Sequence, residues 1–421
     1  MRGGALAEGA STKCCRQRTI EPTTIRSRMI PIFINALSAS AGGGLTYIRN
    51  ILPWLALRDD VRATVLVSEP LRSEIAASDR LTIAQNEWPS GSTKRFWYEQ
   101  RRLPQIIRGS GASVLLSTGN FALYRSPVPQ ILLSRNALYT SKDFVRDLGE
   151  RGDYRLWLDT EAKALFARWS VRSAECTVAP SAAFAAELRQ WTGKDVVSIH
   201  HGFDRESFFH DPSPLPKRVL EQIAATDGSL RLLFVSHYNY FRNFETLIRA
   251  VAILKRQLYP QSLRLLLTCK LKSEDNPGHY HAGRAADLVQ KLGLQREVLE
   301  LGAVPYRLLH HVYRACDFYV TPAYAETFAH PLVEAMASGL PVIASDLAVH
   351  REICRDAALY FPRFSPGGLA ERIVQAIQAA EQTAAMRQAG IQRSRDFSWE
   401  KHVDELLALA RSLAEKNHHF A

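Results

Sequence analysis

Short apolar segments recur along this chain at intervals that leave room for one helix between each pair. Segments of this length that are rich in Val, Ile and Leu are typical of buried parallel strands. Alternation of such strands with helical stretches predicts an α/β fold, with helices covering a parallel sheet. In the first half of the chain, the predicted strands are residues 30–36, 63–67, 113–117, 130–133, 176–179 and 196–199.

The alternation starts again in the second half of the chain, which opens with an apolar segment and then an amphipathic stretch of helical spacing. A length of 421 residues is enough for two domains of ordinary size. The chain ends in a further helical pattern, predicted over 399–413. The second set of elements is a strand at 230–235, a helix at 244–258 and strands at 262–268, 298–301, 318–320 and 341–344.

These patterns divide the chain into four predicted parts. A basic tail comes first and is followed by two α/β domains, and the last segment is a helix that returns toward the first domain. The predicted bounds are 1–28 for the tail, 29–205 and 206–396 for the domains, and 397–421 for the last segment.

Composition limits the class of protein. Hydrophobic residues make up 46% of the chain and charged residues 23%, as in soluble globular proteins. The sequence has no apolar run of the length needed to cross a membrane. The six cysteines are scattered without C-x-x-C or zinc-ligand spacing, which fits a reducing compartment. We therefore expect a cytoplasmic protein.

The net charge of +11 is concentrated toward the start of the chain. Residues 1–28 carry six basic and two acidic groups, residues 29–205 carry 22 and 17, and residues 206–421 carry 25 and 23. An excess of positive charge on the first domain suits an anionic acceptor or an anionic membrane surface. A protein that is basic without such a partner is the open alternative.

Residues 1–28 differ from the rest of the chain. They are polar and Arg-rich, show no periodicity, and lack the apolar core of a secretory signal. We interpret them as a disordered tail or as an extension that is absent from the native protein, with Met29 as the natural start directly before the first predicted strand. A transit peptide is the alternative.

The segment around Pro331 has the signals of a short helix. Pro331 suits the first helical position, Gly339 suits the position just past the helix, and Pro341 prevents its continuation. A helix from about Pro331 to Ser338 would turn its free N–H groups and positive dipole end toward the loop at 327–330. Such a helix end is a natural site for a diphosphate.

Two glutamates flank this loop, and their spacing and surroundings resemble the E-x7-E signature of glycosyltransferase family 4. The matching residues are Glu326, Pro331, Glu334, Ala335-Met336-Ala337, Gly339 and Pro341. The resemblance implies that Glu326 contacts the hydroxyls of the transferred sugar. It also implies that Glu334, in the first turn of the helix, accepts hydrogen bonds from both hydroxyls of the nucleotide ribose.

The loop that follows the first glutamate departs from the family pattern. The family usually places glycines where this chain has Thr327 and Ala329. Backbone N–H groups remain available in this loop, so Thr327, Phe328 and Ala329 are predicted to contact the donor. We expect the loop to be stiffer and less roomy than in the family.

Two cations of the family are matched at a strand-to-helix junction. Arg242 stands at the position of the family's Lys and His237 at that of its Arg. The resemblance implies that these side chains neutralise the donor diphosphate and the charge that grows on the leaving group. Arg242 keeps its charge at every relevant pH, whereas His237 can be neutral.

The first domain is predicted to complete the site. A glycine-rich loop at 38–44 follows the first strand and precedes a helix from about Leu45; a tight turn without a ligand is the alternative interpretation. By resemblance, Gly43 and Gly44 approach the donor phosphates. Many relatives place a histidine beside the donor sugar, and Asn136 is its closest counterpart here, with a purely structural role as the alternative. No D-x-D motif is present, so we predict neither a metal nor a cofactor.

Two segments mix cations with aromatic residues. Residues 94–104 and 155–172 could line the acceptor side, rest on an anionic membrane, or form ordinary core. No nucleic-acid motif accompanies them, so a nucleic-acid partner is not expected. The histidine pairs His200-His201 and His310-His311, and the histidines of His279-x-His281, have no recurring Cys, Asp or Glu at ligand spacing, so structural or surface roles are expected.

The resemblance implies the GT-B fold, in which two Rossmann-like α/β domains face a central cleft. It implies a retaining, metal-independent glycosyltransferase that moves a sugar from a nucleotide-sugar donor to a glycan or lipid-linked acceptor in surface polysaccharide assembly. Glu326, Arg242 and Asn136 are the predicted catalytic residues. A GT-B nucleotide-sugar epimerase and a non-catalytic sugar- or nucleotide-binding relative are the alternatives.

Overall fold

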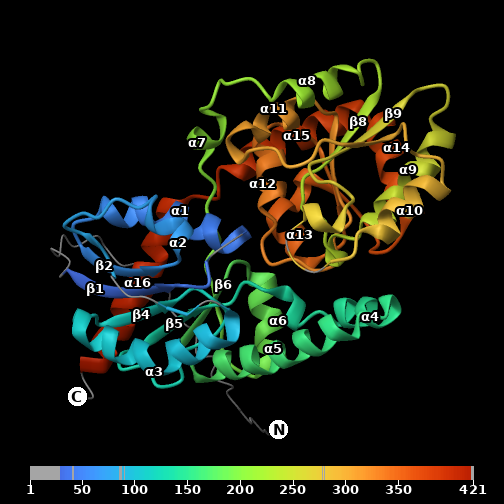
Figure 1. The fold of residues 1–421 in the computed structure, drawn as a ribbon. Helices are drawn as coiled ribbons and strands as arrows, with labels where there is room; N and C mark the ends of the chain where they lie inside the picture. Colours follow the sequence, from blue (N-terminus) through green and yellow to red (C-terminus); the bar gives the residue numbers. More distant parts are fainter. Residues whose placement is uncertain are drawn as a thin grey trace, which may run out of the picture.

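The computed structural model describes residues 29–418 except 40, 41, 85–87, 90, 277 and 279. The predicted tail at 1–28 lies outside these residues, as do Ser40 and Ala41 of the predicted glycine-rich loop and His279. The described chain forms two α/β lobes (Figure 1). In the part that the structure describes, no helix is both long and apolar enough to cross a membrane.

A seven-stranded parallel sheet lies in the first lobe, with the strand order β3-β2-β1-β4-β5-β6-β7. Its central strands are apolar and buried on both faces, as expected where helices cover a parallel sheet. The strands are β1 (Ile30–Ala36), β2 (Val61–Val67), β3 (Leu81–Ile83), β4 (Val114–Ser117), β5 (Gln130–Leu133), β6 (Cys176–Ala179) and β7 (Val197–Ser198).

A six-stranded parallel sheet lies in the second lobe, with the order β10-β9-β8-β11-β12-β13. In both sheets the strand order reverses its direction beside the first strand of the sheet. Each sheet therefore has a switch point, and ligands of open α/β sheets bind there, at the carboxyl ends of the strands. The strands are β8 (Leu230–Phe234), β9 (Leu263–Leu267), β10 (Val298–Glu300), β11 (Phe318–Thr321), β12 (Val342–Ser345) and β13 (Ala358–Phe361).

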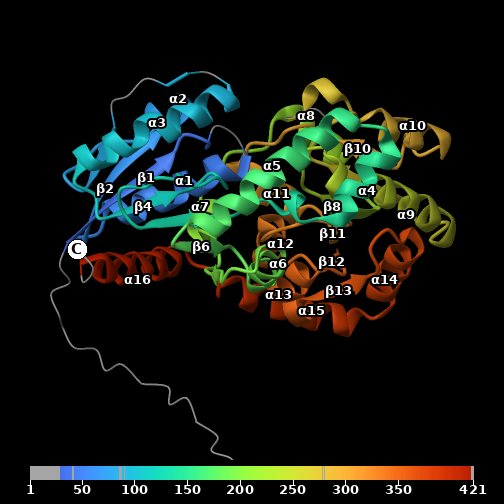
Figure 2. The same cartoon turned by 90° about the horizontal axis from the view of Figure 1, so that it is seen from below.

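The helices cover both sheets and connect the lobes (Figures 1 and 2). Those of the first lobe are α1 (Gly42–Ala56), α2 (Glu69–Arg72), α3 (Ser92–Ser110), α4 (Lys142–Arg151), α5 (Tyr154–Ser173) and α6 (Ala182–Thr192). The remaining helices are α7 (Arg205–Phe209), α8 (Lys217–Ala224), α9 (Phe244–Gln257), α10 (Gly283–Lys291), α11 (Leu309–Arg314), α12 (His330–Ala337), α13 (Ala348–Cys354), α14 (Pro366–Gln378), α15 (Ala380–Ser394) and α16 (Trp399–His418).

Helix α16 lies along the first lobe although it ends the chain (Figure 2). Trp399 and Leu406 are buried in the hydrophobic core of the first lobe. The Tyr47 hydroxyl on α1 lies 2.8 Å from Nε2 of His402. At the start of the helix, a Cβ on Gly202 would lie 2.1 Å from the backbone nitrogen of Trp399, so only glycine fits there.

The predicted architecture of two Rossmann-like α/β domains is confirmed. Two strands were missed, β3 and β13. Strand β3 has only three residues, so its sequence carries too little alternation to be recognised. One further correction concerns the glycine-rich segment, because Gly42–Gly44 form the first turn of α1 rather than a loop before a helix at Leu45.

Candidate functional site

Two adjoining cavities between the lobes contain every side chain or backbone segment that the sequence predicts for the site. One has a volume of about 420 Å³ and the other about 310 Å³. They share Gly43, Arg242, His330 and Pro331. The larger cavity is also lined by Gly44, Asn136 and Glu326–Ala329, and the smaller one by His237 and Glu334.

The loop before α12 has an unusual backbone at Ala329. Its φ is +66°, in the left-handed region that favours glycine. This is one of the positions where the resembling family usually has glycine. Ala329 adopts the left-handed conformation here although glycine would adopt it at a lower energetic cost. Helix α12 begins at His330, one residue before the predicted start.

Glu326 and Arg242 form a partly buried ion pair in the wall of the larger cavity. Glu326 also accepts a hydrogen bond of 3.0 Å from the backbone N–H of Thr327. Burial by itself would raise the pKa of Glu326, but the Arg242 guanidinium and the Thr327 N–H outweigh it, and the pKa lies below its usual value. The Nε of Arg242 is buried and has no hydrogen-bond partner among the described residues.

Glu334 lies in the second turn of α12, because four residues of the helix precede it. The sequence prediction had placed it in the first turn. Its side chain still reaches the cavity, since helical side chains lean toward the N-terminus. The carboxylate is only 4% exposed and accepts a hydrogen bond of 2.8 Å from the Tyr313 hydroxyl. Burial raises the pKa of Glu334 to about 7, despite the opposing effect of this hydrogen bond.

His237 follows β8 at the edge of the smaller cavity. Partial burial and the neighbouring Arg242 lower the pKa of its imidazole. The ring is therefore neutral near pH 7, and it does not supply the second positive charge that the resemblance implied.

The first lobe contributes a cation that sequence reasoning missed. Arg135 lines the larger cavity and donates hydrogen bonds to the carbonyl of Gly43 at 3.2 Å and to that of Thr118 at 2.6 Å. Its guanidinium carbon lies 4.6 Å from the ring centre of Tyr47. Burial lowers the pKa of Arg135 to about 10, so it remains charged at neutral pH.

Asn136 reaches the same cavity and also has a structural task. Its side-chain oxygen accepts a hydrogen bond of 3.0 Å from the backbone N–H of Leu138, at the start of the 3₁₀ helix η1 (Ala137–Tyr139). Both the predicted place in the site and the alternative structural role therefore have a geometric basis.

Two histidines at the centre of the site were also missed. His330 borders both cavities, and its Nε2 lies 3.2 Å from Nδ1 of His201 in the connection between the lobes. Burial lowers the pKa of His330 to about 4 and that of His201 well below its usual value. The sequence showed His330 inside the recognised motif, but its meeting with His201, 129 positions away, depends on how the lobes are joined.

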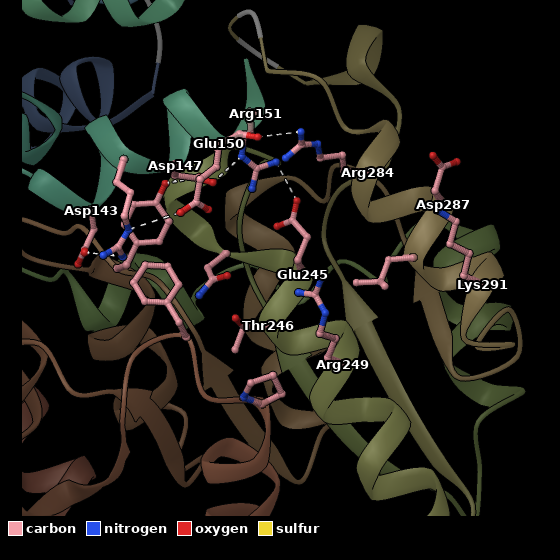
Figure 3. A pocket seen from close by; sticks show the side chains of 16 residues that line it. Asp143, Asp147, Glu150, Arg151, Glu245, Thr246, Arg249, Arg284, Asp287 and Lys291 are labelled. Carbon is pink, nitrogen blue, oxygen red and sulfur yellow. Dashed lines mark hydrogen bonds and ion pairs between the residues drawn. The ribbon is translucent and has the colours of Figure 1, made fainter. Parts of the chain in front are cut away.

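A third and larger cavity, of about 820 Å³, lies at another part of the interface between the lobes, where α4 faces α9 and α10 (Figure 3). Five acidic and five basic side chains line it, so it has no preference for one sign of charge. Arg151 of α4 pairs there with Asp147 at 2.8 Å and with Glu245 of α9 at 2.9 Å. This cluster joins the lobes, and the predicted site residues lie outside it.

No group of three or more His, Cys, Asp or Glu side chains is placed to hold a metal ion within the described ranges. The described histidines of the pairs noted in the sequence have other neighbours. Nε2 of His200 lies 2.6 Å from Oε1 of Glu352, and the ring centroids of His310 and His311 lie 3.9 Å apart.

Comparison with known proteins identifies a family in the second lobe. The model of the family described as "Glycosyl transferases group 1" matches residues 218–393, which contain the whole six-stranded sheet. D-inositol 3-phosphate glycosyltransferase of Corynebacterium aurimucosum is 26% identical over 258 residues, which make up 59% of this chain and 59% of that protein. The chain thus spans less than two thirds of the length of this curated relative.

Solved structures resemble both lobes together. Sucrose-phosphate synthase of Thermosynechococcus elongatus has a TM-score of 0.71 at 19% identity, covering 91% of this chain and 99% of that one. HepE of Anabaena, solved in complex with UDP-glucose, has a TM-score of 0.67 at 18% identity, covering 91% of this chain and 100% of that one. The predicted GT-B arrangement of the two lobes is therefore confirmed.

Proposed function

We propose that this chain is a retaining glycosyltransferase that acts on a nucleotide-sugar donor. The premise is the match of its second lobe to the family "Glycosyl transferases group 1". One observation carries the proposal: Arg242, Glu326 and Glu334 line two joined cavities at the carboxyl ends of the strands. A nucleotide, a diphosphate and a sugar each have a matching partner there.

The nucleotide occupies the smaller cavity in this proposal. Ionised Glu334 accepts hydrogen bonds from the two ribose hydroxyls, a pairing for which a carboxylate has enough acceptor sites. The diphosphate lies at the junction of the cavities, between Arg242 and the N-terminal end of α12. The binding of UDP-glucose by the structural neighbour HepE supports a donor of this class.

The sugar lies in the larger cavity beside Glu326 and Asn136. The bond from the anomeric carbon to the phosphate oxygen breaks, and a bond to the acceptor oxygen forms on the same face. The acceptor proton passes to the departing phosphate oxygen, so no protein base is required. Arg242 stabilises the charge that grows on the leaving group, which is the largest contribution that a site of this kind makes.

We also propose that the reaction needs no metal, because Arg242, Arg135 and the start of α12 supply positive potential around the junction. Transfer is expected to proceed at an unchanged rate after treatment with EDTA. A rate that falls after EDTA and returns with Mg²⁺ or Mn²⁺ would contradict this part of the proposal.

The experiment that tests the function is calorimetric titration of UDP, GDP and ADP into the wild type and Glu334→Ala. One nucleotide should bind to the wild type, and the variant should bind it at least tenfold more weakly, a loss of about 1.4 kcal/mol or more. Glu381→Ala, at an exposed position of α15, is the matched control and should bind normally. Absence of binding by all three nucleotides to folded wild type would overturn the proposal.

The first lobe also supports contact with an anionic membrane. Helix α5 turns small residues inward, while Leu158, Leu165 and Trp169 are 61%, 69% and 57% exposed. A helix of a soluble protein ordinarily buries its large apolar side chains. Exposed arginines on the same helix, at 155, 168 and 172, would lie near lipid headgroups.

Sedimentation with vesicles tests this contact. The wild type should bind vesicles of phosphatidylcholine mixed with phosphatidylglycerol and bind pure phosphatidylcholine poorly. The double substitution Leu158→Ser with Leu165→Ser should weaken binding at least tenfold. Leu57→Ser, which removes an 80% exposed leucine directly after α1, is the control and should leave binding unchanged. Equal binding by both variants, or a dimer that only the double substitution disrupts, would contradict a membrane role for this face.

A further inference from the structure

A separate cavity of about 240 Å³ lies within the first lobe, between α3 and α5. Four aromatic side chains form much of its wall, and the rings of Phe96 and Phe166 join the two helices at a centroid distance of 5.8 Å. Most of its surface is apolar, as in cavities that enclose the hydrophobic part of a small molecule. The four aromatic residues are Phe96, Trp97, Phe121 and Phe166.

This cavity adjoins the larger cavity of the donor site. Ser38 and Gly119 line both of them. A Cβ on Gly119 would lie 2.3 Å from Oγ of Ser38, so a larger residue at 119 would obstruct this junction. The aromatic cavity and the proposed site of sugar transfer are therefore neighbours with a common wall of small residues.

Two of the aromatic side chains that line the cavity also lie at the protein surface. Trp97 is 57% exposed and Phe166 is 43% exposed, and both line the cavity. Phe166 belongs to α5, the helix with large apolar side chains on its outer face. In Figure 1, α3 and α5 lie together along the lower part of the first lobe. The cavity thus lies between this apolar face and the donor site.

Two carboxylates, Glu99 and Asp159, line the mainly apolar cavity, and Asp159 pairs at 2.6 Å with Lys163, which also lines it. Glu99 lines the cavity and accepts a hydrogen bond of 3.0 Å from the side-chain amide of Asn35. Arg95, one turn earlier on α3, lies 3.4 Å from its other oxygen. Burial raises the pKa of Glu99, although Asn35 and Arg95 oppose this effect. A small number of polar groups in an apolar cavity fix the orientation of a ligand.

We propose that this cavity is the acceptor subsite and that the acceptor is an amphiphile with an alkyl chain. The chain lies among the four aromatic rings and leaves the protein past Trp97 and Phe166. A hydroxyl of the head group donates a hydrogen bond to Glu99, and the head continues past Ser38 and Gly119 to the sugar-transfer cavity. The inference rests on the proposed function, and it selects the lipid-linked acceptor over a free glycan.

The size of the cavity fits partial enclosure. A drug-sized ligand needs roughly 300–1,000 Å³, so about 240 Å³ holds only one section of a long molecule. The rest of the chain must lie outside, next to the exposed leucines of α5. A membrane that covers this face would receive it, since removal of apolar CH₂ groups from water is favourable.

Calorimetric titration of decyl maltoside below its micelle concentration tests the subsite, with maltose as the second ligand. Wild type should bind decyl maltoside at least tenfold more tightly than maltose. Ala162→Phe places a ring in the mouth of the cavity from an exposed position and should weaken binding at least tenfold. Gln105→Phe, at an exposed position of α3 outside the cavity, is the matched control and should bind as wild type does.

Two results would overturn the subsite: Ala162→Phe binds decyl maltoside as tightly as Gln105→Phe, or maltose binds as tightly as decyl maltoside. Phe166→Ala provides a second variant if Ala162→Phe does not fold, and it should also weaken binding. Nucleotide titration separates this inference from the proposed function. Ala162→Phe should bind the nucleotide normally, whereas failure of the wild type to bind any nucleotide would contradict the donor site and not the amphiphile site.

Discussion

The carboxylate of Asp147 in the first lobe accepts a hydrogen bond of 2.6 Å from the hydroxyl of Tyr324 in the second lobe, two residues before Glu326. A similar hydrogen bond lies near Arg242, the partner of Glu326 in the ion pair. Asp153 accepts a hydrogen bond of 3.1 Å from the hydroxyl of Tyr240, two residues before Arg242. The first lobe therefore holds the segments that carry both Glu326 and Arg242. Arg151 contacts both places, because it pairs with Asp147 at 2.8 Å and its guanidinium carbon lies 4.2 Å from the ring centre of Tyr240.

Removing these two hydroxyls should slow transfer without weakening nucleotide binding. The double substitution Tyr240→Phe with Tyr324→Phe keeps both rings and deletes the bonds to Asp153 and Asp147. It also deletes the bond of 3.0 Å that the Tyr240 hydroxyl accepts from the backbone N–H of His281 in the same lobe. Each bond to a charged group contributes about 1.5–3 kcal/mol, and its loss frees the lobes to move apart. We expect the kcat of transfer to fall at least tenfold. The nucleotide Kd should stay unchanged, because Glu334 and Arg242 are both in the second lobe.

The matched control is Tyr360→Phe, which removes a hydroxyl that donates to the Arg355 carbonyl at 2.6 Å within the second lobe. It should leave kcat as in wild type. If the double variant and the control have the same kcat, the contacts between the lobes do not position the ion pair.

Glu334 should make both stability and nucleotide binding depend on pH, in opposite directions. Its pKa is raised from about 4.5 to about 7 in the folded protein, so the folded state binds the proton more tightly than the unfolded state does. The free energy of unfolding should therefore decrease as the pH rises from 4.5 to 7, by about 3 kcal/mol in total at about 1.4 kcal/mol per unit of pKa. Glu334→Gln should lack this contribution, which denaturant unfolding across this pH range measures.

Nucleotide binding should strengthen over the same range of pH. Only the ionised carboxylate accepts hydrogen bonds from both ribose hydroxyls with both oxygens. The affinity of wild type should rise as the pH passes through about 7 and then level off. Titrations of Glu334→Gln with the same nucleotide correct for protonation of the phosphates. A wild type and a variant with parallel pH profiles would show that Glu334 does not bind the ribose in its ionised form.

The sequence alone could bring together those residues of the candidate site that lie close to one another along the chain. Glu326, Glu334 and the start of α12 belong to one segment, so their proline, glycine and charge spacing could be interpreted locally. Arg242 was found beside a strand-to-helix junction of the same lobe. All of these residues border the two joined cavities in the structure.

Residues that meet only through tertiary packing were not found. Arg135 contacts Gly43 across 92 positions, and His201 contacts His330 across 129. No local pattern encodes either meeting. The first depends on packing within the first lobe, and the second depends on how the connection around Gly202 joins the lobes. The raised pKa of Glu334 was also beyond the sequence, since it follows from burial that several distant segments produce together.

Replacing Ala329 with glycine should stabilise the protein slightly. A residue with a Cβ in the left-handed region costs about 1–2 kcal/mol, and glycine avoids this cost but loses roughly 0.5–1 kcal/mol of backbone entropy on folding. With φ at +66°, Ala329→Gly should raise the free energy of unfolding by about 0.5–1 kcal/mol. Ala325→Gly is the control, because it is equally buried at 6% exposure and has no positive φ. It should lower stability, and similar losses in both variants would contradict strain at Ala329.

Adding one methyl group at Gly202 should detach the C-terminal helix from its place. The new Cβ would lie 2.1 Å from the Trp399 nitrogen and 2.5 Å from the Ser398 carbonyl carbon, and backbone atoms cannot rotate away as a side chain can. Gly202→Ala should therefore destabilise the protein by more than 3 kcal/mol, in the range of ~3–5 kcal/mol seen when a large buried side chain such as Trp399 loses its contacts.

Gly109→Ala in α3 is the control, since its Cβ would meet nothing within 4 Å, and it should stabilise by roughly 0.5–1 kcal/mol. Hydrogen exchange should show faster exchange across α16 in Gly202→Ala alone; unchanged protection of α16 there would mean that the connection can adjust and that the close approach does not fix the helix.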